Sequence, residues 1–320
     1  MTQRSELTLD DGVKLSVEID GPAGADLTVV LLHGWCQDKR TWQHQRAALR
    51  RLGSHRPRVI AYDTRGHGRS GATRLDSATL GRLGDDLAAV LARYAPSGPL
   101  VLAGHSLGGM TIMEYAHRNP DQFADRVAGL LFASTTAEGH THTRYGLPEP
   151  LAALMRAGET IGAGVLARSG AWCPQRALLP ALRPAARWLL LGDGHPGDAL
   201  DITMRCFART TLRSIGGFRA SIGAQQRLDT LAALGDVPAA VLVGQRDRLT
   251  PPACAESIAA ALPHATLTVL PRAGHMLPLE RPDEVSAALA AIVKQATRGL
   301  GAQRRRAARA RRAAAHEQAA

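Results

Sequence analysis

Short runs of aliphatic residues alternate with longer helix-like stretches through residue 133 of this chain. The strand-like runs lie at residues 6–9, 13–19, 28–32, 59–62, 100–103 and 127–132. Helix-like stretches precede the last three runs, near residues 39–53, 77–94 and 107–117. Strands that are joined through helices of this length lie parallel in one sheet. The alternation therefore predicts an α/β fold with a mostly parallel central sheet flanked by helices.

A long segment without strand-like runs interrupts this alternation. From residue 134 to about residue 236 the sequence is broken by Pro, Gly and Arg and contains only helix-like pieces. Strand-like runs return at residues 239–243 and 266–270, with helix-like stretches at 252–262 and 282–297. We therefore predict a core made of residues 1–133 and 237–297, a helical insertion at residues 134–236, and a flexible basic tail at residues 298–320.

The composition excludes disorder as the dominant state. Of the 320 residues, 45% are hydrophobic and 21% are charged, so the chain can bury enough apolar surface to offset the entropy of ordering. The longest apolar candidate for a membrane span, residues 151–170, is interrupted by Arg156, Glu159 and Arg168. The N-terminal MTQRSELTLD has no hydrophobic stretch after its first basic residue. We therefore expect a soluble, cytoplasmic protein without a transmembrane segment or a secretory signal.

The excess positive charge is concentrated in the tail. Residues 298–320 contain seven arginines and one glutamate, so they supply +6 of the net +11. Because the rest of the chain carries only +5, the sequence predicts no specific binding of nucleic acid. The tail is expected to be a solvated extension, and weak contact with anionic surfaces is the alternative.

The cysteines lie far apart and give no metal-binding pattern. No C-x-x-C pair occurs, and no cysteine lies near a histidine at the spacing of a metal site. We therefore expect four free thiols and neither a metal nor a cofactor. The four are Cys36, Cys173, Cys206 and Cys254.

The sharpest chemical signal is the sequence Gly-His-Ser-Leu-Gly-Gly at residues 104–109. It directly follows the apolar run PLVLA and directly precedes a helix-like stretch, which is the context that a G-x-S-x-G nucleophile turn requires. A chain that turns from strand to helix within one or two residues forces the serine toward positive φ and leaves no room for neighbouring side chains. The pattern thus predicts an exposed, reactive hydroxyl on Ser106.

A serine hydroxyl needs an adjacent base to act as a nucleophile at neutral pH. His275 is the preferred base, because it lies in a loop between the last strand-like run and the closing helix, at the carboxyl edge of the predicted sheet. His105 is expected to pack beside the serine without acting on it, and His33 and His67 are expected to be structural. Three further histidines lie in the insertion, and the sequence does not decide whether they contact substrate or solvent: His140, His142 and His195.

A carboxylate is needed to orient the base. Asp247 follows the strand-like run at residues 239–243, again at the carboxyl edge, and is the preferred partner of His275. A surface ion pair with the flanking arginines is its alternative reading, and Glu138 is the fallback carboxylate.

Two backbone N–H groups are candidates for stabilising an oxyanion. His33-Gly34-Trp35 follows the run at residues 28–32, and a glycine there lets the Trp35 N–H point into the site. With the Leu107 N–H it would form the oxyanion hole. Large apolar residues are candidates for an acyl pocket, with packing onto the sheet as the alternative for each: Met155, Trp172, Trp188, Met204, Phe207 and Met276.

These pieces, in this order, resemble the α/β-hydrolase fold superfamily, and within it the cap-bearing serine esterases and lipases. The resemblance covers roughly residues 6–297 and includes Asp-Thr-Arg-Gly-His-Gly-Arg-Ser at residues 63–70, which is similar to a structural turn of the family. It implies that residues 134–236 form a helical cap, or lid, over the nucleophile. It also implies that Ser106 is the nucleophile, His275 the base and Asp247 its orienting acid, with Trp35 and Leu107 as oxyanion donors.

Departures from related families narrow the implied activity. Epoxide hydrolases and haloalkane dehalogenases carry aspartate where this chain has Ser106, and cofactor-free haloperoxidases usually have proline where it has Cys36. Carbon–carbon hydrolases tend to have H-G-x-G-P-G-A in the loop that begins at His33. Hydrolysis of carboxylic esters with apolar short- to medium-chain acyl groups, or of acylglycerols, remains the expectation. The alternatives are a thioesterase, a haloperoxidase-like perhydrolase, or a ligand-binding receptor with a vestigial triad.

Overall fold

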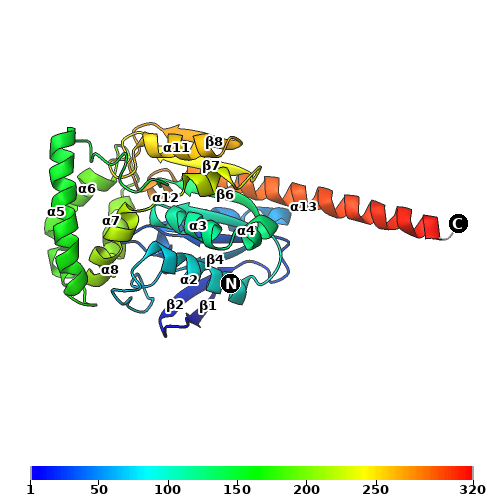
Figure 1. Cartoon of the computed structure of the whole chain (residues 1–320), viewed down its shortest axis with the longest axis horizontal. Coiled ribbons are helices and arrows are strands. Elements are labelled where there is room, and N and C mark those ends of the chain that lie inside the picture. The colour runs from blue at the N-terminus through cyan, green and yellow to red at the C-terminus, as the bar shows by residue number, and fades with distance from the viewer. Residues whose placement is uncertain (1, 319–320) are drawn as a thin grey trace.

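A computed structural model describes residues 2–318 of the chain, apart from the side chains of residues 54, 300 and 302–318. It contains a sheet of eight strands with helices on both sides (Figure 1). The strands are β1 (Gln3–Thr8), β2 (Lys14–Asp20), β3 (Thr28–Leu32), β4 (Arg58–Tyr62), β5 (Leu100–His105), β6 (Val127–Ala133), β7 (Ala239–Gly244) and β8 (Ala265–Leu270).

The sheet has the order β1-β2-β4-β3-β5-β6-β7-β8. The pairs β1–β2 and β2–β4 are antiparallel, and every later pair is parallel, which confirms the predicted mostly parallel sheet. The hairpin between β1 and β2 turns at Asp10-Asp11-Gly12, where Gly12 has a φ of 79°. β3 and β5 are fully buried, in keeping with their continuous apolar runs.

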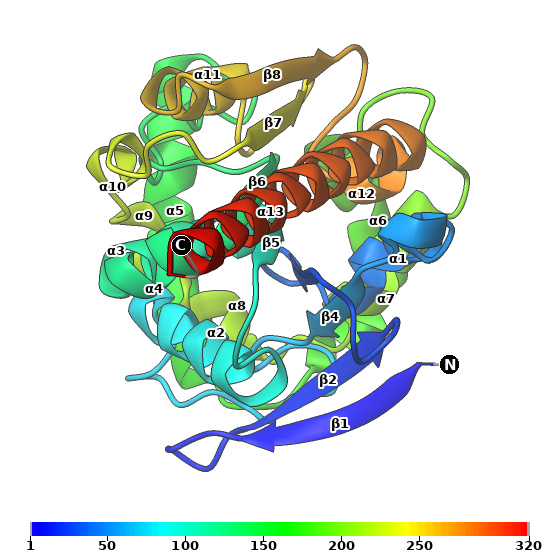
Figure 2. The ribbon, with the colours of Figure 1, turned by 90° about the vertical axis from the view of Figure 1, so that its right-hand side faces the viewer.

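Helices cover both faces of the sheet (Figure 2). One face packs against α2, α3 and α11, and the other against α1 and α13. The helices of the core and its edges are α1 (Gln43–Arg50), α2 (Leu80–Tyr94), α3 (Leu107–Arg118), α4 (Pro120–Arg126), α11 (Pro252–Ala261), α12 (Leu277–Glu280) and α13 (Pro282–Gln318), with 3-10 turns η1 (Lys39–Trp42) and η2 (Gly53–His55).

The segment between β6 and β7 contains only helices and loops, and all of its residues are described. Its larger helices gather at one end of the sheet, beyond the carboxyl ends of the strands (Figure 1). The helices of the whole segment are α5 (Glu149–Arg168), η3 (Pro174–Leu178), α6 (Leu179–Leu190), α7 (Ala199–Phe207), α8 (Leu212–Gly217), α9 (Arg219–Gly223) and α10 (Leu228–Ala232).

The closing helix is longer than the sequence predicted. We expected it to end at residue 297, but α13 continues to Gln318 and projects away from the body at the end opposite α5 (Figure 1). The Arg/Ala-rich sequence after residue 298 has high helix propensity, and no Pro interrupts it. The flexibility and the anionic contacts predicted for residues 298–320 concern side chains that lie mostly outside the described residues, and they stay predictions.

Within the described residues, no helix combines the length and the apolar character that crossing a membrane requires.

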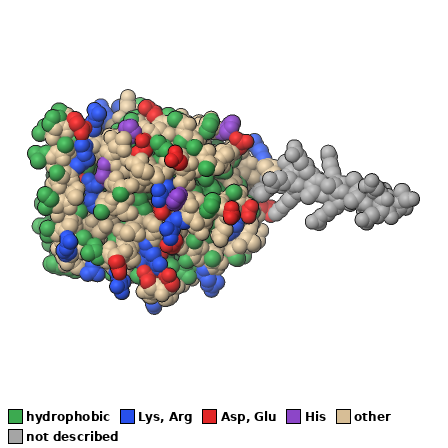
Figure 3. Space-filling model, in the orientation of Figure 1, with side chains coloured by type: hydrophobic (Ala, Val, Ile, Leu, Met, Phe, Trp, Pro, Cys, Tyr) green, Lys and Arg blue, Asp and Glu red, His purple; other side chains and the backbone are tan. Residues whose placement is uncertain are grey.

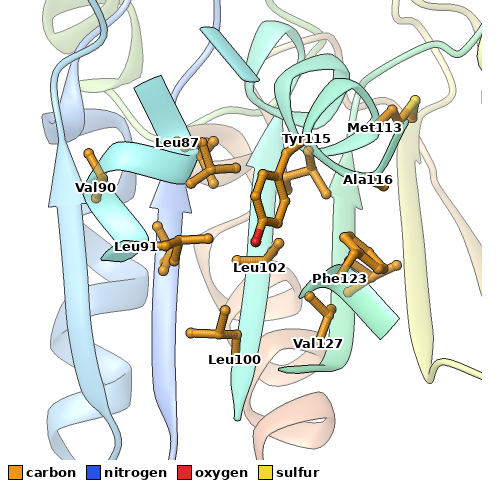
Figure 4. Packing of buried hydrophobic residues seen from close by; sticks show 14 of the residues in the cluster. Leu87, Val90, Leu91, Leu100, Leu102, Met113, Tyr115, Ala116, Phe123 and Val127 are labelled. Carbon is orange, nitrogen blue, oxygen red and sulfur yellow. The ribbon is translucent and has the colours of Figure 1, made fainter. Parts of the chain in front are cut away.

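The main core packs α2 and α3 onto the middle of the sheet (Figure 4). Leu102 lies on β5, the strand that leads to Ser106, and its side chain is completely buried. Leu87 of α2 and Tyr115 of α3 belong to the same cluster and are also completely buried. The strand that carries the candidate nucleophile is thus fixed within a buried hydrophobic core.

Truncating this core tests the packing. We expect Leu102→Ala to lower the free energy of unfolding by about 2–5 kcal/mol, because the removed atoms leave a cavity that the surrounding side chains cannot close. Leu154→Ala is the matched control, since Leu154 on α5 is 70% exposed and its truncation is expected to change that free energy by less than about 0.5 kcal/mol. Urea denaturation of both variants measures the difference, and equal losses would contradict the packing described.

Candidate active site

Ser106 lies at the corner between β5 and α3, in a backbone conformation that residues other than glycine rarely adopt. Its φ is 50° and its ψ is −117°. The crowding predicted from the glycines is present: a Cβ at Gly104 would lie 2.4 Å from the Gly109 nitrogen, and one at Gly108 would lie 2.2 Å from the Leu32 oxygen. Because both clashes involve backbone atoms, only glycine fits at these two positions. The turn therefore holds the Ser106 side chain clear of the sheet.

His275 and Asp247 meet at the carboxyl edge of the sheet although 28 residues separate them. The His275 Nδ1 lies 2.9 Å from Asp247 Oδ2 and 3.1 Å from Oδ1. Both side chains are buried. The Asp247 carboxylate also accepts hydrogen bonds from the Thr250 N–H and hydroxyl, each at 2.9 Å. These bonds fix both the position and the orientation of the carboxylate.

The electrostatics of this pair favour a charged aspartate. Burial acts to raise the pKa of Asp247, but the charge and hydrogen bond of His275, together with the bonds from Thr250, outweigh it and lower the pKa below its ordinary value. An ionised Asp247 accepts a hydrogen bond from the N–H at His275 Nδ1. The other ring nitrogen, Nε2, is then the one left to act on a group in the cavity that His275 and Ser106 both line.

A second buried carboxylate, Glu280, organises the loop that carries His275. Its oxygens accept hydrogen bonds from the backbone N–H groups of Gly192 at 2.7 Å, Gly274 at 2.9 Å and Met276 at 2.9 Å. Burial raises the pKa of Glu280, and the three N–H groups oppose that shift. Glu280 is not among the residues predicted from the sequence. An acidic side chain five positions after His275, in an otherwise apolar stretch, was the available signal.

The two predicted oxyanion donors belong to residues near Ser106: Leu107 follows it directly, and Trp35 follows Gly34, which packs against it. Among the described residues, neither the Trp35 N–H nor the Leu107 N–H has a hydrogen-bond partner, and both residues line the cavity. The backbone at Gly34 can lie close to His105 and Ser106 only because it carries no side chain. A Cβ there would lie 2.7 Å from His105 Nδ1 and 3.2 Å from the Ser106 Cβ. Whether these N–H groups bind an oxyanion stays a prediction.

The histidines assigned to packing have structural partners. His33 accepts a hydrogen bond from the Thr64 N–H at 3.0 Å, and His67 bonds the Arg65 carbonyl at 2.9 Å. His105 donates to the His275 carbonyl at 2.9 Å, so it supports the loop of His275. Burial, and then the neighbouring His275, lower the pKa of His105 to about 3, which keeps its ring neutral at physiological pH.

A cavity of about 350 Å³ opens above Ser106 and His275. Of the apolar residues predicted to line it, Met204, Phe207 and Met276 do so. The inner wall of the insertion is contributed by α6, through side chains spaced three or four residues apart on one face of that helix. These are Leu182, Ala185, Ala186 and Leu189.

The structure places the other three predicted residues, Met155, Trp172 and Trp188, outside the lining of this cavity. Trp172 is 59% exposed and donates its indole N–H to the Ser169 carbonyl. Trp188 lies on the outer face of α6, where the Arg248 guanidinium covers its ring. The space-filling view shows apolar side chains at the end of the molecule formed by α5 (Figure 3). Leu154 and Ile161, both on α5, are largely exposed. Side-chain size alone does not identify the lining residues. The position of each residue around its helix decides whether its side chain faces the cavity.

The comparisons with known proteins agree with this architecture. The alpha/beta hydrolase family profile matches residues 29–288. The chain belongs to the alpha/beta hydrolase family. RutD of Variovorax paradoxus, a protein named for carbamate hydrolysis, is 31% identical over 268 residues, which cover 82% of this hydrolase and 89% of RutD.

Two further relatives carry esterase or lipase names. A thermophilic esterase from Thermogutta terrifontis has a similar structure, with a TM-score of 0.71 at 27% identity, covering 92% of this hydrolase and 99% of that chain. A monoacylglycerol lipase from Mycolicibacterium smegmatis is 33% identical over 102 residues, which cover 31% of this hydrolase and 35% of that protein.

A polar cluster in the insertion lines part of the cavity of this hydrolase. The Arg219 guanidinium donates to Glu159 Oε2 at 2.8 Å, the Tyr145 hydroxyl donates to the same oxygen at 2.7 Å, and Arg219 also contacts His140. Burial, and then Arg219, lower the pKa of His140 to about 4. Of the three insertion histidines left open by the sequence, His140 thus faces the cavity.

The other two insertion histidines, His142 and His195, do not line the cavity. His142 lies 3.1 Å from the fallback carboxylate Glu138, which is therefore paired away from His275, and His195 bonds the Pro196 carbonyl. The four cysteines are free. Among the described residues, no group of three or more His, Cys, Asp or Glu side chains is arranged to hold a metal ion.

Replacing Glu280 tests its role in this loop. We expect Glu280→Gln to lower the free energy of unfolding by about 2–4 kcal/mol, because a neutral amide gives up charge-assisted bonds and presents N–H donors to backbone N–H groups. Glu256→Gln, on the exposed side of α11, is the control and should change that free energy by less than about 0.5 kcal/mol. If both variants unfold at the same urea concentration as the wild type, the three bonds are not what holds the loop.

The lowered pKa of Asp247 makes the free energy of unfolding depend on pH. Its folded-state pKa lies below the unfolded value of about 3.9, so ionised Asp247 stabilises the fold above that pH, and the contribution is lost as pH falls through the folded-state pKa. We expect the stability difference between wild type and Asp247→Asn to be full near pH ~6 and to shrink below pH ~4. Urea titrations across this range measure it, and a constant difference would contradict the assignment.

Proposed function

We propose that this protein is a serine hydrolase that cleaves carboxylic esters through an acyl-enzyme intermediate. The observation that carries the proposal is the shared cavity. Ser106, held at positive φ, and His275, whose Nδ1 bonds the buried Asp247, both line it. A strained serine, a base and an orienting carboxylate are the three groups that acyl transfer by serine requires.

Each residue has a defined part in the proposed reaction. The Ser106 oxygen attacks the ester carbonyl carbon while His275 Nε2 takes the hydroxyl proton, and Asp247 stabilises the resulting imidazolium. His275 then gives that proton to the departing alcohol as the carbon–oxygen bond breaks. Water attacks the acyl-enzyme with the same proton transfers, which releases the acid and restores the Ser106 hydroxyl.

The oxyanion is assigned to the backbone. The carbonyl oxygen becomes negatively charged in the tetrahedral intermediates. The N–H groups of Trp35 and Leu107, two residues that line the cavity, have no partner among the described residues and are assigned to it. Leu107 is the first residue of α3, so the positive end of that helix dipole adds to the stabilisation. One such donor is typically worth about 10²–10³ in rate.

The cavity wall favours an apolar acyl group. Met204 and Phe207 of α7 and the inner face of α6 supply aliphatic and aromatic surface opposite the candidate nucleophile. We therefore assign short- to medium-chain acyl esters or acylglycerols as substrates and residues 134–236 as the lid of the site. The esterase and monoacylglycerol lipase names of two relatives support this class.

Carbamate hydrolysis is the second candidate. It is favoured by the 31% identity to RutD, which covers most of both chains. The same residues would act, because a carbamate also presents a carbonyl carbon to the serine and a leaving group to the imidazole. Relative turnover of a matched ester and carbamate distinguishes the two.

Removing the nucleophile tests the mechanism. We expect Ser106→Ala to lower kcat for p-nitrophenyl butyrate and octanoate by at least about 10³-fold, because no other group forms the acyl-enzyme. Ser134→Ala is the matched control: Ser134 is also buried with positive φ, at the end of the neighbouring strand β6, and it does not line the cavity. Turnover that is unchanged in Ser106→Ala would remove the mechanism.

A further inference from the structure

Gln37 is a buried polar side chain in the wall of the candidate active site. It lies two residues after Trp35 and is only 3% exposed, yet it lines the same cavity as Ser106 and His275. Its Oε1 is fully buried without a hydrogen-bond partner, and no described residue bonds its Nε2. The proposed mechanism gives this carboxamide no task.

The other buried glutamines also have an Oε1 without a partner, but they differ from Gln37 in their amide nitrogen, which is bonded. Gln45 donates its amide to the Pro278 carbonyl, Gln175 to the Thr210 carbonyl and Gln225 to the Met110 carbonyl. Each of these side chains ties two segments of the backbone together. Among the described residues, Gln37 is the buried glutamine whose carboxamide is bonded to nothing.

The surroundings of Gln37 place it close to the reacting groups. Its own N–H bonds the Gly34 carbonyl at 3.1 Å, which closes a turn around Trp35 and Cys36. Gly34 packs against Ser106, so this turn abuts the nucleophile directly. The α7 residues that line the cavity are apolar except for Thr203, whose hydroxyl is already bonded to the Ala199 carbonyl. Gln37 thus offers this cavity an amide N–H that is bonded to no described residue.

We propose that the Gln37 carboxamide binds a hydroxyl group that the substrate carries close to its scissile carbonyl. This inference rests on the proposed function and specifies its substrate class as hydroxyl-bearing esters. The hydroxyl oxygen accepts a hydrogen bond from Nε2, because Oε1 is closed off from the cavity and Nε2 is the polar atom of this side chain left without a partner. A buried amide N–H without a partner destabilises the free protein, and a substrate hydroxyl that accepts from Nε2 satisfies it on binding. An ester that lacks the hydroxyl leaves the amide unpaired in the complex.

Two pairs of esters test the proposal and locate the hydroxyl. Ethyl 3-hydroxybutyrate against ethyl butyrate places it on the acyl side, and glycerol monobutyrate against propyl butyrate places it on the alcohol side. We expect the wild type to prefer the hydroxylated ester in one pair by about 10-fold or more in kcat/KM. In Gln37→Met, which keeps the length of the side chain but not its hydrogen bonds, that preference should fall to about one.

The control is Thr203→Val, which removes a cavity hydroxyl that is already bonded within α7 and should leave the preference ratio as it is. Gln37→Leu serves as a second variant if Gln37→Met does not fold. A wild type without preference in either pair, or a Gln37→Met variant that keeps the preference, overturns the proposal.

A binding measurement separates this proposal from the proposed function. Calorimetry of glycerol monobutyrate, ethyl 3-hydroxybutyrate and their unhydroxylated partners on Ser106→Ala, with and without Gln37→Met, needs no turnover. Suppose that the wild type hydrolyses none of these esters, but that Ser106→Ala binds a hydroxylated ester more tightly than its unhydroxylated partner and loses this difference with Gln37→Met. The hydrolase proposal then fails and the subsite stands. Equal or absent binding across both pairs overturns the subsite.

Discussion

The sharp corner between β5 and α3 is the constraint on which the rest of the site depends. The chain reverses from a buried strand into a buried helix at Ser106, and the backbone atoms of Leu32 and Gly109 lie so close that only hydrogen fits at Gly108 and Gly104. The cost of the positive φ at Ser106 is borne by the packing of β5 and α3 into the main core. A loosely packed chain would relax this turn and withdraw the hydroxyl.

The parallel sheet brings the other groups to that corner. Trp35, Asp247 and His275 each follow the carboxyl end of a different strand, so the strand order places them at one edge. Two buried carboxylates then fix the loops. Asp247 orients the His275 ring, and Glu280 accepts hydrogen bonds from three backbone N–H groups. The positions in this site are therefore set by backbone geometry and charge, and the helical insertion supplies the wall above them.

Local sequence signals predicted the sheet and the position of the corner, because strand periodicity and the glycines around residue 106 report on the backbone directly. The inner wall of the insertion could not be predicted from residue size. Trp188 faces outward and Leu189 inward, since one step along α6 turns the side chain by about 100°. Glu280 and Gln37 were missed because their significance lies in which partners surround them, and that depends on loops from distant parts of the chain.

The central claim is that Ser106 is made reactive by His275 within one cavity, and covalent labelling with a fluorophosphonate probe tests it most directly. The account predicts a single phosphonyl adduct, located on Ser106 by mass spectrometry of the peptides. Labelling should become slower by orders of magnitude in His275→Ala, where no base remains to take the serine proton. An adduct on another residue, or a labelling rate that the loss of the imidazole leaves unchanged, would contradict it.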